Sequence, residues 1–444
     1  MDITELIIEI GFWISWLLIP IVYELVPALK SLISLSFYKF HSKRKILREY
    51  PFLTLIIPVY NSEKSLYNCI RSVSDSTYPS EYIKIIVVDN QSKDNSFDQF
   101  VRAQNDFSDL IIQWMSTDQG KARALNSAIY NSIGKYVVHI DSDGILEKNA
   151  LKNIIAEFEN DVTIDALTGA ILTRFKLIKD TKSKFLKFIR ENEYLEYAQS
   201  FLAGRAIESE GNKLFTMSGA FSAFRRDKLL YTQLYNTETV GEDIDMTFQI
   251  RYQLNGKVLL CPNAIFYVDP LDDLNKLYTQ RQRWQRGELE TLHLFLKNKS
   301  ISIRKFFSNF IVRRLIVDHT ILLLRMIWLG ALISLISFGY AANVVGISFF
   351  ILYLMYLIIS SLNFVSIQSF LKQFPLDRKY YISKWYILFS LPVYYFVVSC
   401  IQVLGIINSM TQSAKWTTTS LKKELVSLRR ILDHDIKKIK DNLK

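Results

Sequence analysis

Short apolar runs alternate with amphipathic segments between residues 50 and 296. Strands are predicted over residues 52–59, 83–89, 110–115 and 136–141, and helices over residues 63–76, 95–104 and 120–132. The predicted strands are rich in β-branched residues and lack polar alternation, which is typical of strands buried on both faces. Because strands and helices alternate along the chain, we expect an α/β domain with a parallel sheet.

Three apolar runs lie outside this middle region. Residues 10–29 carry one charge, Glu24, and residues 326–371 and 385–414 carry none. At about 20 residues per membrane helix, these runs predict one, two and one spans. The first run lacks a small-residue cleavage site, so it is interpreted as an anchor and not as a signal peptide. The predicted organisation is an N-terminal anchor (1–45), a soluble domain (50–296), interfacial helices (297–318), membrane helices (319–414) and an amphipathic basic tail (415–444).

The distribution of basic residues predicts the orientation in the membrane. Lysines and arginines follow the first run between residues 39 and 48, whereas acidic residues precede it, which places the soluble domain in the cytosol. The loop at residues 372–384 and the tail are both basic, yet one apolar run separates them. One segment therefore does not cross simply. Either Pro392 divides the last run into a re-entrant pair, or residues 313–325 lie along the membrane surface.

Polar residues stand where three of the predicted strands end. They are the segments Pro58-Val59-Tyr60-Asn61, Asp89-Asn90 and Asp141-Ser142-Asp143. In parallel α/β sheets, ligands bind outside the carboxyl ends of the strands. We therefore expect these three segments to converge on one edge of the sheet.

Two carboxylates flank a single residue in Asp141-Ser142-Asp143. Such a pair is either a solvated turn or a site for a hard cation such as Mg²⁺ or Mn²⁺, which prefers oxygen ligands. The helix predicted to begin at Gly120-Lys121-Ala122-Arg123 offers backbone N–H groups and two cations to an anion. Together the two features favour a site for a nucleoside diphosphate.

The overall charge agrees with an anionic ligand. The formal net charge of the 444 residues is +11, which favours phosphate-bearing or lipid partners. The three cysteines are scattered without metal-ligand spacing, so neither a disulfide framework nor a zinc site is expected.

Six motifs occur in the order found in family 2 glycosyltransferases. The chain resembles the membrane-integrated, processive members, which include the bacterial poly-N-acetylglucosamine, hyaluronan and cellulose synthases. The last motif matches the pattern QxxRW of those enzymes. The motifs are Pro58–Asn61, Asp89, Gly120–Asn126, Asp141–Asp143, Gly241–Asp243 and Gln280–Trp284.

The resemblance implies a GT-A fold, which is the Rossmann-like fold of nucleotide-diphospho-sugar transferases, between N- and C-terminal membrane helices. It implies Asp243 as the general base and Mg²⁺ or Mn²⁺ as the cofactor. Nucleotide-sugar binding would fall to Pro58, Tyr60, Asn61, Asp89, Lys121, Asp141, Gln280 and Arg283, acceptor binding to Ser218, Gly219, Glu242 and Trp284, and metal binding to Asp143 and Asp141.

These assignments predict a multi-pass enzyme of the cell membrane that extends a β-linked exopolysaccharide from a UDP-sugar and inverts the configuration of the transferred sugar. The implied partners are the donor, the growing polysaccharide, membrane lipid and a small membrane accessory subunit, but no nucleic acid. Two alternatives stay open. One is a non-processive enzyme that glycosylates a lipid, and the other is a transporter whose soluble domain senses a nucleotide sugar.

Overall fold

The computed structural model describes residues 49–296, 325–339 and 341–411, together with residues 21–26 and positions 29, 33, 47, 322 and 323. The predicted interfacial helices and the basic tail lie outside these residues, as does most of the N-terminal anchor. Those assignments therefore stay predictions.

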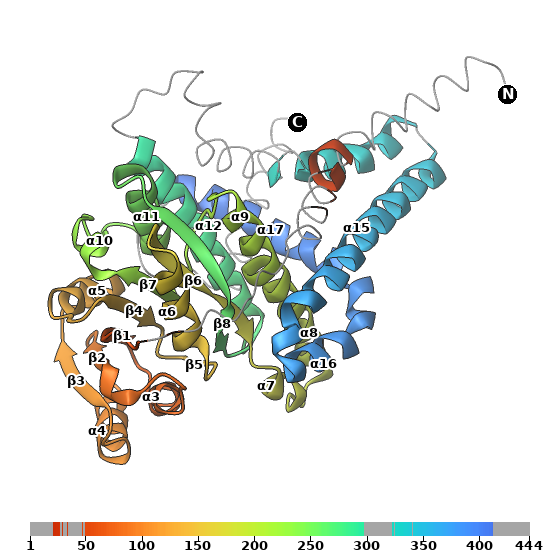
Figure 1. Cartoon of the computed structure of the whole chain (residues 1–444). Helices are drawn as coiled ribbons and strands as arrows, with labels where there is room; N and C mark the ends of the chain where they lie inside the picture. Colours follow the sequence, from red (N-terminus) through yellow and green to blue (C-terminus); the bar gives the residue numbers. More distant parts are fainter. Residues whose placement is uncertain are drawn as a thin grey trace.

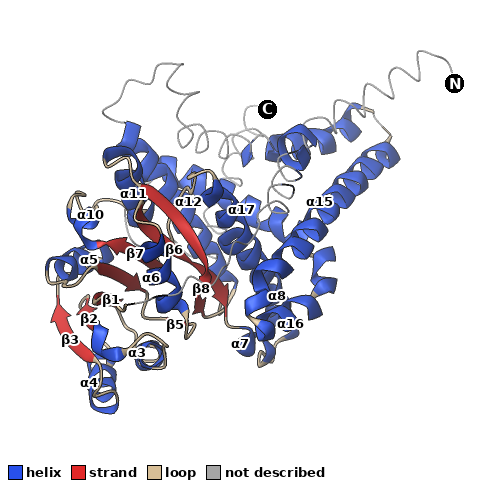
Figure 2. Ribbon diagram, in the orientation of Figure 1, coloured by secondary structure: helices blue, strands red, loops and turns tan. Residues whose placement is uncertain are grey.

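An eight-stranded mixed sheet forms the centre of the soluble domain (Figure 1, Figure 2). Its strands are β1 (Leu53–Val59), β2 (Ile83–Asp89), β3 (Ile111–Ser116), β4 (Tyr136–Ile140), β5 (Gly144–Leu146), β6 (Ile164–Thr173), β7 (Phe221–Arg225) and β8 (Lys257–Val268). The order across the sheet is β3-β2-β1-β4-β7-β6-β8-β5. The first four strands pair in parallel, as predicted, and β7 runs antiparallel between β4 and β6.

The predicted strands and helices of the N-terminal half are confirmed to within a few residues at their ends. The helices of the soluble domain are α3 (Leu66–Ser74), α4 (Ser96–Asp106), α5 (Lys121–Tyr130), α6 (Ala150–Asn160), α7 (Phe175–Lys179), α8 (Lys184–Tyr197), α9 (Arg205–Glu210), α10 (Arg226–Leu230), α11 (Glu242–Phe248) and α12 (Leu274–Leu296). A π-helical segment, Ala198–Gly204, joins α8 to α9, and a second, Gln249–Gln253, follows α11.

Both faces of the sheet are covered by hydrophobic cores. Every residue of β1 is buried, and successive residues face opposite cores, because side chains alternate along a strand. Leu55 and Ile57 pack with α3 and α6, whereas Ile56 packs with α5. This two-sided burial explains why the strand sequences lack polar alternation.

The apolar C-terminal segments pack against α8 and the π-helical segment that follows it (Figure 1). They form α15 (Ala342–Phe370), α16 (Pro375–Ser383) and α17 (Leu391–Thr411). Phe364, Tyr381 and Tyr394 are buried against Tyr194 and Leu202. The C-terminal helices also contact the sheet directly, because the Tyr267 hydroxyl of β8 donates a hydrogen bond to the Asp377 carboxyl group of α16 at 2.8 Å.

One segment of the described chain, residues 342–373, is both long and apolar enough to cross a membrane, with a mean hydropathy of 2.2. Large apolar side chains along α15, such as Phe350, Ile358 and Val365, are exposed. Pro392 occupies the second position of α17, where a proline costs no helical hydrogen bond. The 385–414 run is thus divided before Pro392, into a 3₁₀ segment, Trp385–Phe389, and α17.

Candidate active site

The three polar segments converge on the carboxyl edge of the parallel strands, as predicted. In register, Val59 at the end of β1 pairs with Asp89 at the end of β2. The side chains of Ser62 and Ser142, which follow β1 and β4, are hydrogen bonded at 2.7 Å. The Asn61 side chain accepts a hydrogen bond from the Lys93 backbone N–H at 2.8 Å. This hydrogen bond connects the loop after β1 to the loop after β2.

Antiparallel β7 adds a fourth segment to this edge. Because β7 runs against β4, its first residue, Phe221, stands beside Ile140, the last residue of β4. The segment Ser218-Gly219-Ala220 therefore lies next to Asp141, whose backbone N–H donates to the Ala220 carbonyl at 3.1 Å. Residues predicted for the donor and for the acceptor thus meet at one place.

Lys121 lies at the centre of the cluster. It is the first residue of α5, and its ammonium group donates to Asp141 Oδ1 at 2.5 Å and to the Gly219 carbonyl at 2.9 Å. Glu242 Oε1 lies 3.9 Å away. Burial alone would lower the pKa of Lys121, but the carboxylates of Asp141 and Glu242 outweigh it and raise that pKa. Lys121 is therefore positively charged, and the acidic side chains near it are Asp141, Glu242 and Asp243.

Asp141 and Asp143 follow β4 on either side of the buried Ser142. Asp141 is held by Lys121, whereas the side chain of Asp143 is exposed. Among the residues that the structure describes, no group of three or more Asp, Glu, His or Cys side chains is arranged to hold a metal ion. Any cation at this pair would thus need further oxygen ligands from a substrate or from water.

Glu242 and Asp243 begin α11 on the opposite side of Lys121. Asp243 Oδ2 accepts a hydrogen bond from the Gly219 N–H at 3.1 Å, and Oδ1 accepts one from the Ile244 N–H at 2.9 Å. Burial raises the pKa of both carboxyl groups. It raises the pKa of Glu242 to about 7, against the opposing charge of Lys121 and with a further contribution from Asp243. Raised carboxyl pKa values of this kind are typical of groups that exchange protons near neutral pH.

The QxxRW segment lies on α12. Gln280 donates to the Tyr197 hydroxyl at 3.3 Å, Arg283 is exposed, and Trp284 packs edge-on against Phe201 at a ring distance of 5.6 Å. The buried Arg281 lies 4.4 Å above the Trp284 ring and pairs with Glu196 at 2.6 Å. Trp284 therefore contacts both Phe201 and Arg281.

The other predicted residues have these positions. Pro58 is buried within β1, and Tyr60, just beyond its end, is exposed. Asp89 Oδ1 accepts from the Ser92 N–H at 3.0 Å, and the buried Ser218 donates from its backbone to Thr168 at 2.9 Å. All of these contacts are compatible with the predicted roles, which stay predictions.

Two contributors to the site carried no sequence signal. The first is His139, whose Nε2 lies 3.1 Å from the Gly219 carbonyl oxygen. In the sequence this histidine stands inside an apolar strand and is not part of any motif. Burial, and then the charge of Lys121, lowers the pKa of His139 to about 4, so its ring is neutral at pH 7. Arg281 is an unspecified position of QxxRW, and its burial against Glu196 depends on the packing of α12 on α8.

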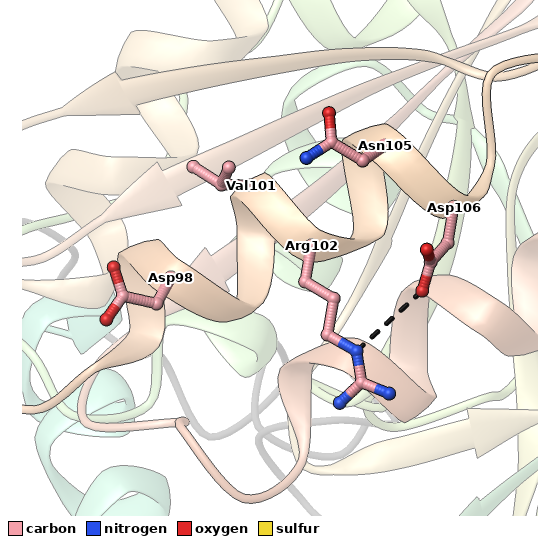
Figure 3. A pocket seen from close by; sticks show the side chains of 5 residues that line it. All are labelled: Asp98, Val101, Arg102, Asn105 and Asp106. Carbon is pink, nitrogen blue, oxygen red and sulfur yellow. Dashed lines mark ion pairs between the residues drawn. The ribbon is translucent and has the colours of Figure 1, made fainter.

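A surface hollow of about 340 Å³ is lined by Asp98, Val101, Arg102, Asn105 and Asp106 of α4 (Figure 3). Its one ion pair, between Arg102 and Asp106, is exposed. It contains none of the residues of the acidic cluster, so we do not assign it to the active site.

The model of the family "Glycosyl transferase family 2" matches residues 54–230, which extend from β1 through α10. The match includes strands β1 to β7, and it ends before α11, which carries Glu242 and Asp243. A solved mannosyltransferase from Pyrobaculum calidifontis, in complex with GDP-Man and Mn²⁺, is 15% identical and superposes with a TM-score of 0.50 over 86% of this chain and 99% of that one. This likeness concerns the fold alone, and it confirms the predicted GT-A-like architecture.

Two curated relatives are similar over the same region. The chain is 25% identical over 263 residues to the poly-beta-1,6-N-acetyl-D-glucosamine synthase of Staphylococcus aureus (strain COL), which is 59% of this chain and 58% of that protein. It is 25% identical over 256 residues to the probable glycosyltransferase YdaM of Bacillus subtilis (strain 168), which is 57% and 59% of the two chains. The match thus spans about three fifths of the length of these relatives.

Proposed function

We propose that this protein is a membrane-embedded, inverting glycosyltransferase that extends a β-linked polysaccharide from a UDP-sugar. The observation that carries the proposal is the cluster of Lys121, Asp141, Glu242 and Asp243 around Gly219, at the carboxyl edge of the parallel strands. The match of residues 54–230 to the glycosyl transferase family 2 model supports it. The similarity to a polysaccharide synthase supports a polymer as the product.

The donor would lie over the ends of β1, β2 and β4. Asn61 and Asp89 offer polar atoms for the nucleoside, and Lys121 offers a cation for the diphosphate. Asp141 and Asp143 would hold Mg²⁺ or Mn²⁺, because carboxylate oxygens are ligands that these ions prefer and the two side chains flank the single residue Ser142. Such an ion, when bound, would stabilise the negative charge that develops on the leaving UDP.

Transfer requires a base on the acceptor side. Asp243 would take the proton of the attacking hydroxyl while the oxygen forms the new bond to the anomeric carbon and the bond to UDP breaks. Because the hydroxyl attacks opposite the leaving group, a single displacement inverts the configuration. Hydrogen bonds from Gly219 and Ile244 fix both oxygens of Asp243, so the base is oriented before the acceptor arrives.

Trp284 is the proposed platform for the acceptor sugar, because a flat apolar ring matches the C–H face of a pyranose. Its contacts with Phe201 and Arg281 hold the indole ring in one orientation. Arg283, exposed two residues beyond Arg281 on α12, is the proposed contact for the diphosphate. The apolar α15 would anchor the enzyme in the bilayer with the site on the cytosolic side.

The test measures UDP release by purified protein with a panel of UDP-sugars, and the length of any product. We expect release with one donor, a polymeric product, and loss of transfer in Asp243→Asn with unchanged UDP affinity. Asp245→Asn is the matched control, because Asp245 lies on the same helix and is hydrogen bonded to Gln249, outside the cluster. If the product is a lipid that carries a single sugar, the enzyme glycosylates a lipid and does not make a polymer. If Asp243→Asn transfers sugar at the wild-type rate, Asp243 is not the general base.

A further inference from the structure

His139 lies beneath the segment that orients the proposed base. It stands on β4, two residues before Asp141, and its side chain is 3% exposed. Nε2 lies 3.1 Å from the Gly219 carbonyl oxygen, and Nδ1 lies 2.9 Å from the Tyr235 hydroxyl. The imidazole therefore bridges two segments that are not neighbours in the sheet.

The contacts determine where the proton lies. A carbonyl oxygen only accepts, so Nε2 must carry the hydrogen and donate it to Gly219. Nδ1 then has a lone pair and accepts the hydrogen bond from the Tyr235 hydroxyl. Both nitrogen atoms of the neutral imidazole are thus hydrogen bonded, and these two bonds fix the orientation of the ring.

Tyr235 is itself held by the helix that begins with Lys121. The Asn126 side chain accepts from the Tyr235 N–H at 2.9 Å and donates to the Tyr235 carbonyl at 2.8 Å. A continuous chain of hydrogen bonds therefore runs from Asn126 through Tyr235 and His139 to Gly219. It continues from the Gly219 N–H to Asp243 Oδ2 at 3.1 Å.

We propose that His139, held by Tyr235, is a positioning residue that fixes the Gly219 backbone so that its N–H orients Asp243 for catalysis. This inference rests on the proposed function, because it takes Asp243 as the base. Without the imidazole, the Gly219 carbonyl keeps Lys121 as a partner, at 2.9 Å. Lys121 is itself proposed to contact the diphosphate, whereas His139 has no proposed contact with a substrate, so loss of the imidazole would remove from the Gly219 carbonyl a hydrogen bond that does not depend on the donor.

The test compares substitutions that keep or remove the hydrogen bonds. A glutamine side chain offers an NH₂ group that donates and a carbonyl oxygen that accepts, so it can replace both hydrogen bonds of a neutral imidazole, whereas leucine can replace neither. His139→Gln and His139→Leu are therefore compared with Tyr235→Phe, which removes one hydroxyl. Tyr231→Phe is the matched control, because Tyr231 is 75% exposed and four residues away. The measurements are kcat, donor KM, UDP affinity and melting temperature.

We expect His139→Leu to lower kcat about tenfold or more, since small misplacements of reacting groups are costly. Donor KM and UDP affinity should stay within about twofold, because the interaction acts in the transition state. His139→Gln should recover most of kcat, Tyr235→Phe should lower it less than His139→Leu, and Tyr231→Phe should match the wild type. If His139→Leu fails to fold, the comparison of Tyr235→Phe with Tyr231→Phe decides.

The inference is overturned if Tyr235→Phe and His139→Leu keep wild-type kcat, or if His139→Gln is as impaired as His139→Leu although folded. It is also overturned if His139→Leu and Tyr235→Phe weaken UDP affinity and leave kcat unchanged. These outcomes differ from failure of the proposed function, in which the wild type consumes no UDP-sugar or Asp243→Asn transfers normally.

Discussion

Replacing Gly219 with alanine would place a methyl group directly beside the proposed base. The new Cβ would lie 3.2 Å from Asp243 Oδ2 and 3.6 Å from Lys121 Nζ. Carbon atoms prefer non-bonded contacts of about 3.5 Å, so the carboxylate must yield by about 0.3 Å. The backbone of Gly219 is not in the left-handed region, so the alanine acts through this contact and not through backbone strain.

The size of the effect follows from this displacement. A misplacement of about 1 Å can cost about a hundredfold in rate, so about 0.3 Å corresponds to about a fourfold loss of kcat. UDP affinity should stay unchanged, because Gly219 faces Asp243 on the acceptor side of Lys121. The assay is steady-state UDP release at saturating donor, together with calorimetric titration of UDP.

Gly346→Ala is the matched control, because a Cβ at Gly346 meets nothing within 4 Å. It should keep the wild-type kcat. The reasoning is refuted if Gly219→Ala also keeps the wild-type kcat, or if its loss appears as weaker UDP binding with kcat intact.

Three further predictions concern the metal, the pH dependence and the acceptor platform. Asp143→Asn should lower UDP release by about a hundredfold, and excess chelator should stop release until Mg²⁺ or Mn²⁺ is added; full activity in chelator would contradict this. Because burial raises the pKa of Glu242 to about 7, Glu242 should become protonated and activity should fall as the pH falls through about 7; the raised pKa of Asp243 acts in the same direction, and a profile that is flat down to pH 5 would contradict a role for the Glu242 carboxylate. Trp284→Ala should keep UDP affinity but give shorter chains or free sugar on a gel, whereas wild-type chain lengths would remove Trp284 from the acceptor site.

The secondary structure of the N-terminal half is predictable because its signal is local. A run such as residues 53–59 is mostly apolar and rich in β-branched residues, and α5 begins directly after Gly120 with a regular apolar pattern. No strand or helix was predicted between residues 142 and 296, where the structure has β5 to β8, α6 to α12 and two π-helical segments that interrupt the regular helical period. A pattern with a period of 3.6 residues does not describe such segments.

The sequence indicated several residues that lie together in the candidate site, but it did not predict the contacts among them. Asp141 and Asp143 stand out because two carboxylates follow a buried strand, whereas Asp243 was assigned from the resemblance to the family. Nothing in the sequence pairs Lys121 with Asp141 and Gly219, or places Arg281 between Glu196 and Trp284. Those contacts depend on which elements become neighbours.

The sequence by itself determined the α/β alternation, the polar strand ends and the long apolar runs, because each is a property of a short stretch of chain. Only the tertiary structure decided that β7 inserts antiparallel between β4 and β6. That insertion brings Gly219 to His139 and Lys121 across 80 and 98 residues of chain. Strand neighbours are selected by the packing of the whole sheet, and local periodicity is the same whichever neighbour a strand acquires.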